Sequence, residues 1–288
     1  MIMKHIYLLL IGCAVASAGC IKQIEVDFTP EVKPVLNALL QCDSVVKADV
    51  SMSVRPNEFL EGQRNDAVVK VYENGVFMET LQMKLEYNNA RYVGTKRLKS
   101  GSHYRVTAEV PGYPMVDGED VIPGQLGEFS AVLEKRSVNG AEDYFIKLKI
   151  NDPATERNYY RVRLFAWYDY NNGITPSRSH AVFTYEGPEF WDLYQGDESG
   201  FQYVFDDAMF GGHIRQLLFK TRKWTSVKKF ELEVSQLSRD AYLYLQSLEL
   251  QRIKNHQAFA EKVTVHNNIR NGLGIVGGIA IGWKIFIP

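Results

Sequence analysis

The sequence AVVKVYENGVF, residues 67–77, decides the class of fold. Ala67, Val69 and Val71 fall on one face of an extended chain, since side chains alternate with a period of two along a strand. Asn74-Gly75 follows, the dipeptide best able to take the two positive φ values of a type I′ turn, and Val76 begins a return strand. The stretch therefore predicts an antiparallel β-hairpin.

The same alternation recurs along the chain and indicates a mainly β protein. Every second side chain is apolar from Tyr104 to Val110, and the pattern returns at 146–150, 160–164 and 230–234 with Lys, Arg or Glu in between, which we expect to face solvent. Prolines and glycines between 111 and 124 are typical of a boundary. We therefore expect two β-sandwich (immunoglobulin-like) modules, an N-terminal one at 35–124 and a C-terminal β-rich domain at 125–288.

One α-helix is expected late in the second module, at about 238–255. Ser238 can cap its N-terminus, because a serine hydroxyl accepts a hydrogen bond from a backbone N–H of the first turn. Ala241, Leu245 and Leu248 fall on one face at helical spacing and predict the buried side.

The N-terminus has the layout of a secretory signal. Lys4 supplies positive charge, an apolar run spans 6–16, and small residues precede Cys20. The apolar run is too short to cross a bilayer, which takes about 20 helical residues. We expect a signal peptide at 1–19 and a lipidated cysteine with its tether at 20–34, so that the lipid on Cys20 attaches the chain to a membrane. Lipidation at Cys13 and cleavage without lipidation remain alternatives.

Composition sets further bounds. The net charge of −1 gives no broad electrostatic footprint for nucleic acid, so no nucleic-acid partner is expected. Cys42 is the one thiol after Cys20 and has no intramolecular disulfide partner, so we expect it to act as a small buried apolar residue.

Three stretches of the chain carry a family resemblance. They are Ile24-Glu25-Val26 close after Cys20, the Asn151-Asp152-Pro153 turn leading to Asn158-Tyr159-Tyr160, and Asn267-Asn268-Ile269 with Asn271-Gly272-Leu273-Gly274. In these the chain resembles the domain of unknown function 4249 family, outer-membrane lipoproteins of Bacteroidota often encoded beside TonB-dependent receptors. The resemblance implies the cell envelope, a role beside such a receptor and no catalytic residues. We expect the protein to face the cell surface rather than the periplasm.

Most of the sequence motifs that suggest catalysis or cofactor binding have a simpler structural explanation. Residues 272–277 read GLGIVG and match the dinucleotide fingerprint, but that motif needs a following helix and an acidic residue about 20 positions on. We expect instead that these glycines allow close backbone approach between terminal strands, with no nucleotide and no cofactor. The histidines lack metal-ligand spacing, so no metal is expected. The acidic residues near 186–192 and 206–207 could form a glycosidase pair, although solvated loop carboxylates are the simpler interpretation.

Aromatic residues in the least regular region are the candidate binding platform. They are Trp167, Tyr170, Trp191, Tyr194 and Tyr203, which could stack a ligand on loops. Three hypotheses follow. The first is a non-enzymatic accessory subunit of a TonB-dependent receptor, which predicts a partly apolar docking patch. The second is a free-standing surface module that binds a ligand such as a glycan or a peptide, and the third is an envelope hydrolase.

Overall fold

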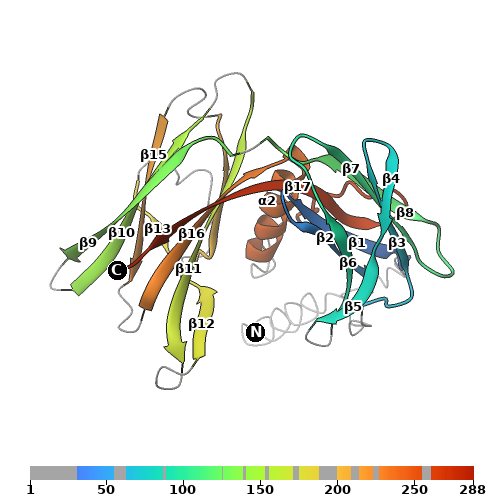
Figure 1. The fold of residues 1–288 in the computed structure, drawn as a ribbon, viewed down its shortest axis with the longest axis horizontal. Helices are drawn as coiled ribbons and strands as arrows, with labels where there is room; N and C mark the ends of the chain where they lie inside the picture. Colours follow the sequence, from blue (N-terminus) through green and yellow to red (C-terminus); the bar gives the residue numbers. More distant parts are fainter. Residues whose placement is uncertain are drawn as a thin grey trace, which may run out of the picture. The chain divides into compact units, whose positions relative to one another are not determined.

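The computed structural model describes residues 31–288 apart from several short segments. The segments outside it are 55–62, 87–88, 125, 139–140, 153–155, 171–174, 188–199, 209–213, 223–226 and 255–260. The predicted signal peptide and Cys20 also lie outside the described residues. Within them the chain is mainly β with the single α-helix α2 (Arg239–Lys254), and none of its helical structure is long and apolar enough to cross a membrane (Figure 1).

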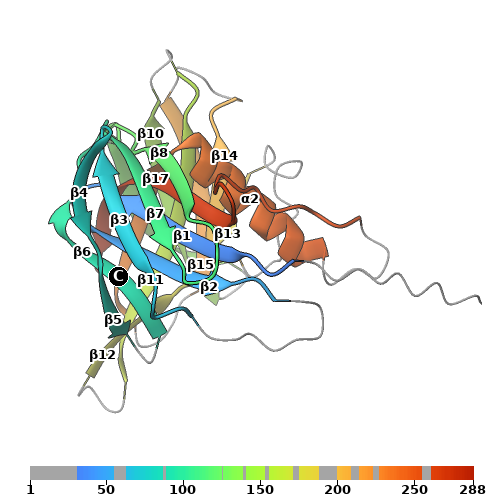
Figure 2. The same cartoon turned by 90° about the vertical axis from the view of Figure 1, so that its right-hand side faces the viewer.

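The N-terminal strands form two layers that enclose one core. One layer runs β1 (Pro34–Gln41), β2 (Val45–Met52), β6 (Asn89–Arg97) and β5 (Gln82–Glu86). The other runs β4 (Val76–Thr80), β3 (Val68–Glu73), β7 (His103–Glu109) and β8 (Val116–Val121), and Figure 2 shows it in front of β1 and β2. Leu36 and Val50 of the first layer and Val69 and Val106 of the second are all fully buried in the same cluster. Cys42 is half-buried against this core, so the expectation that it is buried holds only in part.

The hairpin predicted from residues 67–77 is confirmed. β3 and β4 are antiparallel, and the turn residues Asn74 and Gly75 have φ values of 50° and 80°. Val69 and Val71 are fully buried, because the strand's period of two places both on the core side.

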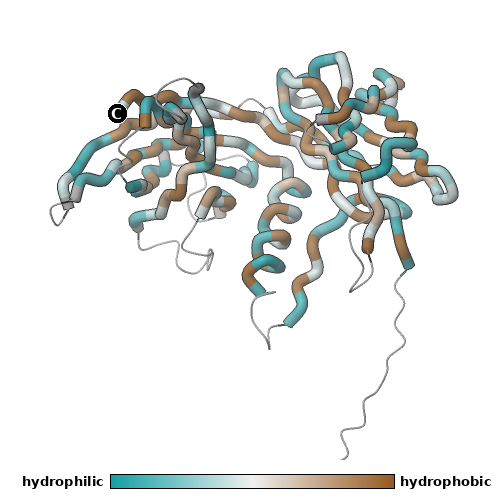
Figure 3. Tube along the Cα trace, turned by 90° about the horizontal axis from the view of Figure 1, so that it is seen from below, coloured by the Kyte–Doolittle hydropathy of each residue, from teal (hydrophilic) through white to brown (hydrophobic). Residues whose placement is uncertain are grey.

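The C-terminal strands form a second pair of layers. One layer runs β12 (Thr175–His180), β11 (Tyr159–Tyr170), β16 (Val227–Leu237) and β17 (Leu273–Phe286), and β14 (Gln202–Asp206) also pairs with β11. The other runs β13 (Thr184–Tyr185), β15 (Ile214–Arg222), β10 (Ala141–Asn151) and β9 (Phe129–Val138). The expected apolar positions Ile146, Leu148, Val162, Leu232 and Val234 are all fully buried between them. Figure 3 shows hydrophobic and hydrophilic positions alternating along these strands.

Strand β17 belongs to both halves of the chain. Its first half, from Leu273 to Ile279, runs parallel to β1, and its second half, from Ile279 to Phe286, runs antiparallel to β16. The described strands therefore include one continuous nine-stranded sheet rather than two self-contained modules. Strand β17 thus crosses the division expected at residue 124, since residues 273–279 pair with β1 of the N-terminal strands.

Helix α2 (Arg239–Lys254) confirms the predicted helix. The Ser238 hydroxyl accepts a hydrogen bond from the N–H of Ala241 at 3.1 Å, which is an N-cap, and also donates to Asp120 of β8. Ala241 and Leu245 are buried, whereas Leu248 is 42% exposed, so the prediction for Leu248 was wrong. The buried helix residues Ala241, Tyr242 and Leu245, all in the first two turns, pack against Leu237 and Ile279.

The glycines of the terminal strand permit close backbone approach, as expected. A Cβ on Gly278 would lie 2.3 Å from the carbonyl oxygen of Val121, and one on Gly274, where φ is +116°, would lie 2.2 Å from that of Leu36. The Gly278 N–H donates to the Asp120 carboxylate at 2.9 Å, and burial raises the pKa of Asp120. The run that matches the dinucleotide fingerprint is thus a strand beneath β8 and beside β1.

Candidate functional site

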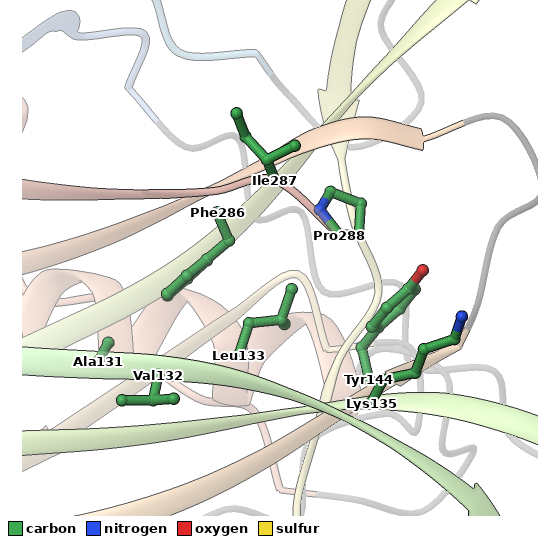
Figure 4. A pocket seen from close by; sticks show the side chains of 8 residues that line it. All are labelled: Ala131, Val132, Leu133, Lys135, Tyr144, Phe286, Ile287 and Pro288. Atoms are coloured by element: carbon green, nitrogen blue, oxygen red, sulfur yellow. The ribbon is translucent and has the colours of Figure 1, made fainter.

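An open groove lies where two sheet edges face each other. Within the described residues β9 pairs only with β10, and β17 beyond Ile279 has a partner strand on one side only. The space between these edges is about 340 Å³ and is lined mainly by apolar atoms (Figure 4). We call it the β9–β17 groove, and its lining includes Ala131, Val132, Leu133, Phe286, Ile287 and Pro288.

The rim of this groove exposes large apolar side chains. Ile287 is 84% exposed and Val132 is 56% exposed on the opposite side of the groove. Apolar side chains that gather in this way mark interaction sites more often than scattered ones do.

A second surface lies on the face of the C-terminal sheet that points away from the core of β9–β10–β15. Three charged residues fill its centre. Glu233 of β16 accepts from Arg163 at 2.5 and 2.9 Å and from Arg161 at 3.0 Å, and Ser235 donates to the same carboxylate at 2.9 Å. The Glu233 side chain is 1% exposed and that of Arg161 is 5% exposed. The expectation that the charged residues of β11 and β16 all face solvent was wrong at these positions.

Aromatic side chains and a further arginine continue this surface. The guanidinium of Arg178 lies 3.6 Å from the centre of the Phe165 ring and 5.3 Å from that of Trp283. Phe165 and Trp283 have ring centres 5.9 Å apart, and His180 lies 4.5 Å from Phe165. We call this surface the arginine–aromatic face; it comprises Arg161, Arg163, Phe165, Trp167, Arg178, His180, Lys229, Glu231, Glu233 and Trp283.

The carboxylates of this face are held ionised. Burial acts to raise the pKa of Glu233, but hydrogen bonding to Arg163 and the charges of Arg161 and Arg163 outweigh it and lower the pKa. Burial also opposes ionisation of Glu231, yet hydrogen bonds that include those from Lys229 and Arg178 lower its pKa to about 2. Burial, with the charge of Arg163, lowers the pKa of Arg161 to about 10, so this arginine still carries its charge at neutral pH.

The structure brings only part of the predicted platform to this face. Trp167 lies on it, and the Lys229 ammonium sits 4.5 Å from the centre of its ring. Tyr203 packs in the core instead, with its hydroxyl accepting from the Tyr185 N–H at 2.9 Å and donating to the Phe183 carbonyl at 3.2 Å. Trp191, Tyr194 and the side chain of Tyr170 lie outside the described residues.

The sequence contained a signal for the residues that were missed. Phe165 stands two positions before Trp167, so the strand period places both on one face. Trp283 reaches this face through its pairing with Glu233 of β16, 50 residues away in sequence, which no local pattern reveals, whereas Arg178 lies opposite Trp167 in the adjacent strand β12.

The acidic residues considered for glycosidase chemistry have structural partners where they are described. Asp206 pairs with Arg157 at 2.6 Å, and Asp207 accepts from the Asn158 N–H at 2.7 Å. Among the described residues no group of three or more His, Cys, Asp or Glu side chains is placed to hold a metal ion.

The segment before β17 joins the two halves of the chain. The Asn268 side-chain amide accepts from the Val276 N–H at 3.0 Å and donates to the Val276 carbonyl at 2.8 Å. Arg270 pairs with Asp117 of β8, and His266 Nε2 lies 3.0 Å from the Asp240 carboxylate of α2. These polar residues of the Asn-rich stretch therefore fix the course of the chain into β17.

Together the fold and its two surfaces define a mainly β protein with a groove at its sheet edges and a charged aromatic sheet face. The chain belongs to the family described as Domain of unknown function (DUF4249), whose model matches residues 21–284. This confirms the resemblance seen in the sequence.

Comparison with solved structures and curated proteins adds little. A putative membrane anchored protein from Corynebacterium diphtheriae is 10% identical, with 86% of this chain and 60% of that chain covered and a TM-score of 0.21. The Enterococcus faecalis MSCRAMM ACE, which binds its ligands by the collagen Hug model, is also 10% identical, with 91% and 97% covered and a TM-score of 0.21. No curated protein matches the sequence.

Proposed function

We propose that this protein is an exported, lipid-anchored accessory module that docks on an integral outer-membrane partner, a TonB-dependent receptor. Residues 1–19 act as the signal peptide, and Cys20 carries the lipid that holds the protein at the outer membrane, facing the cell surface. In this proposal each pair of layers acts as an immunoglobulin-like sandwich, and the protein is not an enzyme.

The observation that carries the docking proposal is the exposed apolar rim of the β9–β17 groove. Ile287 at 84% exposure and Val132 at 56% exposure flank an apolar groove of about 340 Å³. A stable interface commonly buries about 800 Å² on each partner, and its centre is more apolar than its rim. The groove and its rim supply such a centre.

A ligand-binding module is the second candidate function. The arginine–aromatic face favours it, because exposed Trp283 and partly exposed Arg178 offer both a ring face and a cation to solvent. A hydrolase has less support, since the acidic residues described near Asp206 are engaged in structural contacts.

The test is a pull-down from detergent-solubilised outer membranes, with mass spectrometry of the proteins that co-purify. The wild-type chain is compared with Cys20→Ala, which removes the lipid, and with Val132→Glu/Ile287→Glu, which charges the groove rim. Val76→Glu is the matched control, because Val76 is 70% exposed on the distant β3–β4 hairpin.

The proposal expects a TonB-dependent receptor with the wild type and with Val76→Glu. It expects at least about a tenfold loss of that receptor with the rim variant. Cys20→Ala should leave the membrane fraction, and protease treatment of intact cells should digest the wild-type protein. Recovery of the lipidated wild type without any receptor would refute the docking proposal, and equal recovery with the rim variant would refute the groove as its site.

A further inference from the structure

The arginine–aromatic face carries more positive than negative charge. Its cations are Arg161, Arg163, Arg178 and Lys229, and its carboxylates are Glu231 and Glu233. The neighbouring pair of Lys228 and Asp169, 3.2 Å apart, adds no net charge. Two carboxylates therefore neutralise only two of the four cations, which leaves this sheet face with a net positive charge.

The deepest of these cations is incompletely satisfied. Arg161 is 4% exposed, and its Nε has no hydrogen-bond partner among the described residues, although its Nη2 donates to Glu233. A buried cation without full compensation is costly, and a nearby anion lowers that cost. The excess charge therefore favours an anion on this face.

The exposed part of the face has a shape suited to a planar anion beside a ring. Arg178 donates through Nε to Glu231 at 2.9 Å, and its Nη groups make no hydrogen bond within the described residues. Its guanidinium is stacked 3.6 Å from the Phe165 ring, which restrains its plane. The side chain is 33% exposed, so a carboxylate from solvent can reach it.

Trp283 provides a second contact surface beside Arg178, the exposed face of an indole ring. It is 45% exposed, and its ring centre lies 5.3 Å from the Arg178 guanidinium. The C–H face of a sugar ring is apolar and slightly positive, so it packs on the negative face of an indole. Phe201, 50% exposed and 5.9 Å from His180, extends the apolar area across β12. An open face of this kind suits a chain of sugar rings better than a small acid, which is normally enclosed in a pocket.

We propose that the arginine–aromatic face binds a carboxylated saccharide, with its carboxylate on Arg178 and an adjoining sugar ring on Trp283. This site is separate from the β9–β17 groove and does not depend on the docking proposal.

Binding is measured by isothermal titration calorimetry on the mature lipidated chain in detergent micelles. The probes are short oligomers of galacturonate, glucuronate and mannuronate, and sialyllactose. The corresponding neutral oligosaccharides, sodium sulfate and inorganic phosphate form the comparison arms. Arg178→Gln and Trp283→Ala are the test variants. Arg136→Gln is the matched control, since Arg136 also stacks on a phenylalanine, 4.5 Å from Phe145, and pairs with a glutamate, but on the opposite layer.

The proposal expects at least one carboxylated oligomer to bind at least about tenfold more tightly than its neutral counterpart. Each test variant should weaken that binding at least tenfold while the protein still unfolds cooperatively on heating, and Arg136→Gln should leave the binding unchanged. If the neutral oligomers bound equally well, the claim that Arg178 recognises a carboxylate would be refuted. If sulfate or phosphate bound as tightly as the saccharides, the claim that the site recognises a sugar would be refuted, and the site would bind anions in general. Absence of binding by all four probes at 10 mM would overturn the site altogether.

Discussion

Replacing Glu233 with glutamine tests whether the buried carboxylate holds the C-terminal sheet together. The carboxylate is 1% exposed and lies 2.5 to 3.0 Å from the guanidinium groups of Arg163 and Arg161. Glutamine keeps the size and removes the charge, so two arginines remain with no countercharge, one of them fully buried. Breaking a buried pair in this way costs about 3–5 kcal/mol. Since 1 kcal/mol shifts Tm by about 2–4 °C in a chain of this size, we expect a loss of about 10 °C.

The measurement is thermal unfolding at pH 7, followed by circular dichroism. Glu134→Gln is the matched control, because Glu134 also lies between two cations, Arg136 and Lys147, but is 33% exposed. An exposed, solvent-screened pair contributes little to stability, so this variant should lose less than about 4 °C. Adding Arg161→Met to Glu233→Gln should restore part of the loss, because it removes the unpaired cation. Equal losses for Glu233→Gln and Glu134→Gln would refute the role assigned to the buried carboxylate.

Three further predictions concern other parts of the chain. Gly278→Ala should lower the free energy of unfolding by about 1–3 kcal/mol in a urea titration, because its Cβ would lie 2.3 Å from the Val121 carbonyl oxygen. Gly124→Ala is the control: no atom lies within 4 Å of its Cβ, so the free energy of unfolding should change little. Gly75→Ala should cost about 1–2 kcal/mol by urea unfolding, since φ is +80° there; an unchanged midpoint would contradict the turn. The folded pKa of Glu231, about 2, lies below its ordinary value of 4.5, so its contribution to stability is present above pH 5 and is lost as the pH falls toward 2. The stability difference between wild type and Glu231→Gln should therefore shrink over that range, and a difference independent of pH would contradict the assignment.

Local patterns in the sequence were sufficient for the hairpin at residues 67–77 and for the helix. Asn74-Gly75 determines its own turn, and Ser238 with Ala241 determines the start of α2, because the interactions involved lie within a few residues. The path of β17 could not be predicted in this way. Its two halves pair with β1 and β16, which stand hundreds and tens of residues away, and its apolar pattern is compatible with either partner.

The sequence predicted what kind of surface the candidate site would be, but not which residues would form it. Trp167 was expected at a binding platform and does lie on the arginine–aromatic face, yet Phe165 and Trp283 complete that face through pairings across three strands. Alternation predicted that Arg161 and Glu233 face away from the apolar core, which is correct. It could not predict that the sheet face itself would bury them, because burial there depends on neighbours from β11, β16 and β17 together.

The shared strand also has a consequence for how the proposed docking would work. β1 begins at Pro34, shortly after the proposed tether, and pairs with the start of β17 at Leu273, whereas the β9–β17 groove lies at the other end of that 14-residue strand. At about 3.3 Å per residue, β17 can separate the two by up to about 45 Å. Because β17 is hydrogen-bonded along both halves of the chain, force on a docked partner would pass to β1 through the backbone ladder. The paired strands β17 and β1 thus link the groove to the first strand of the described chain, so that under the docking proposal one backbone ladder would carry the load.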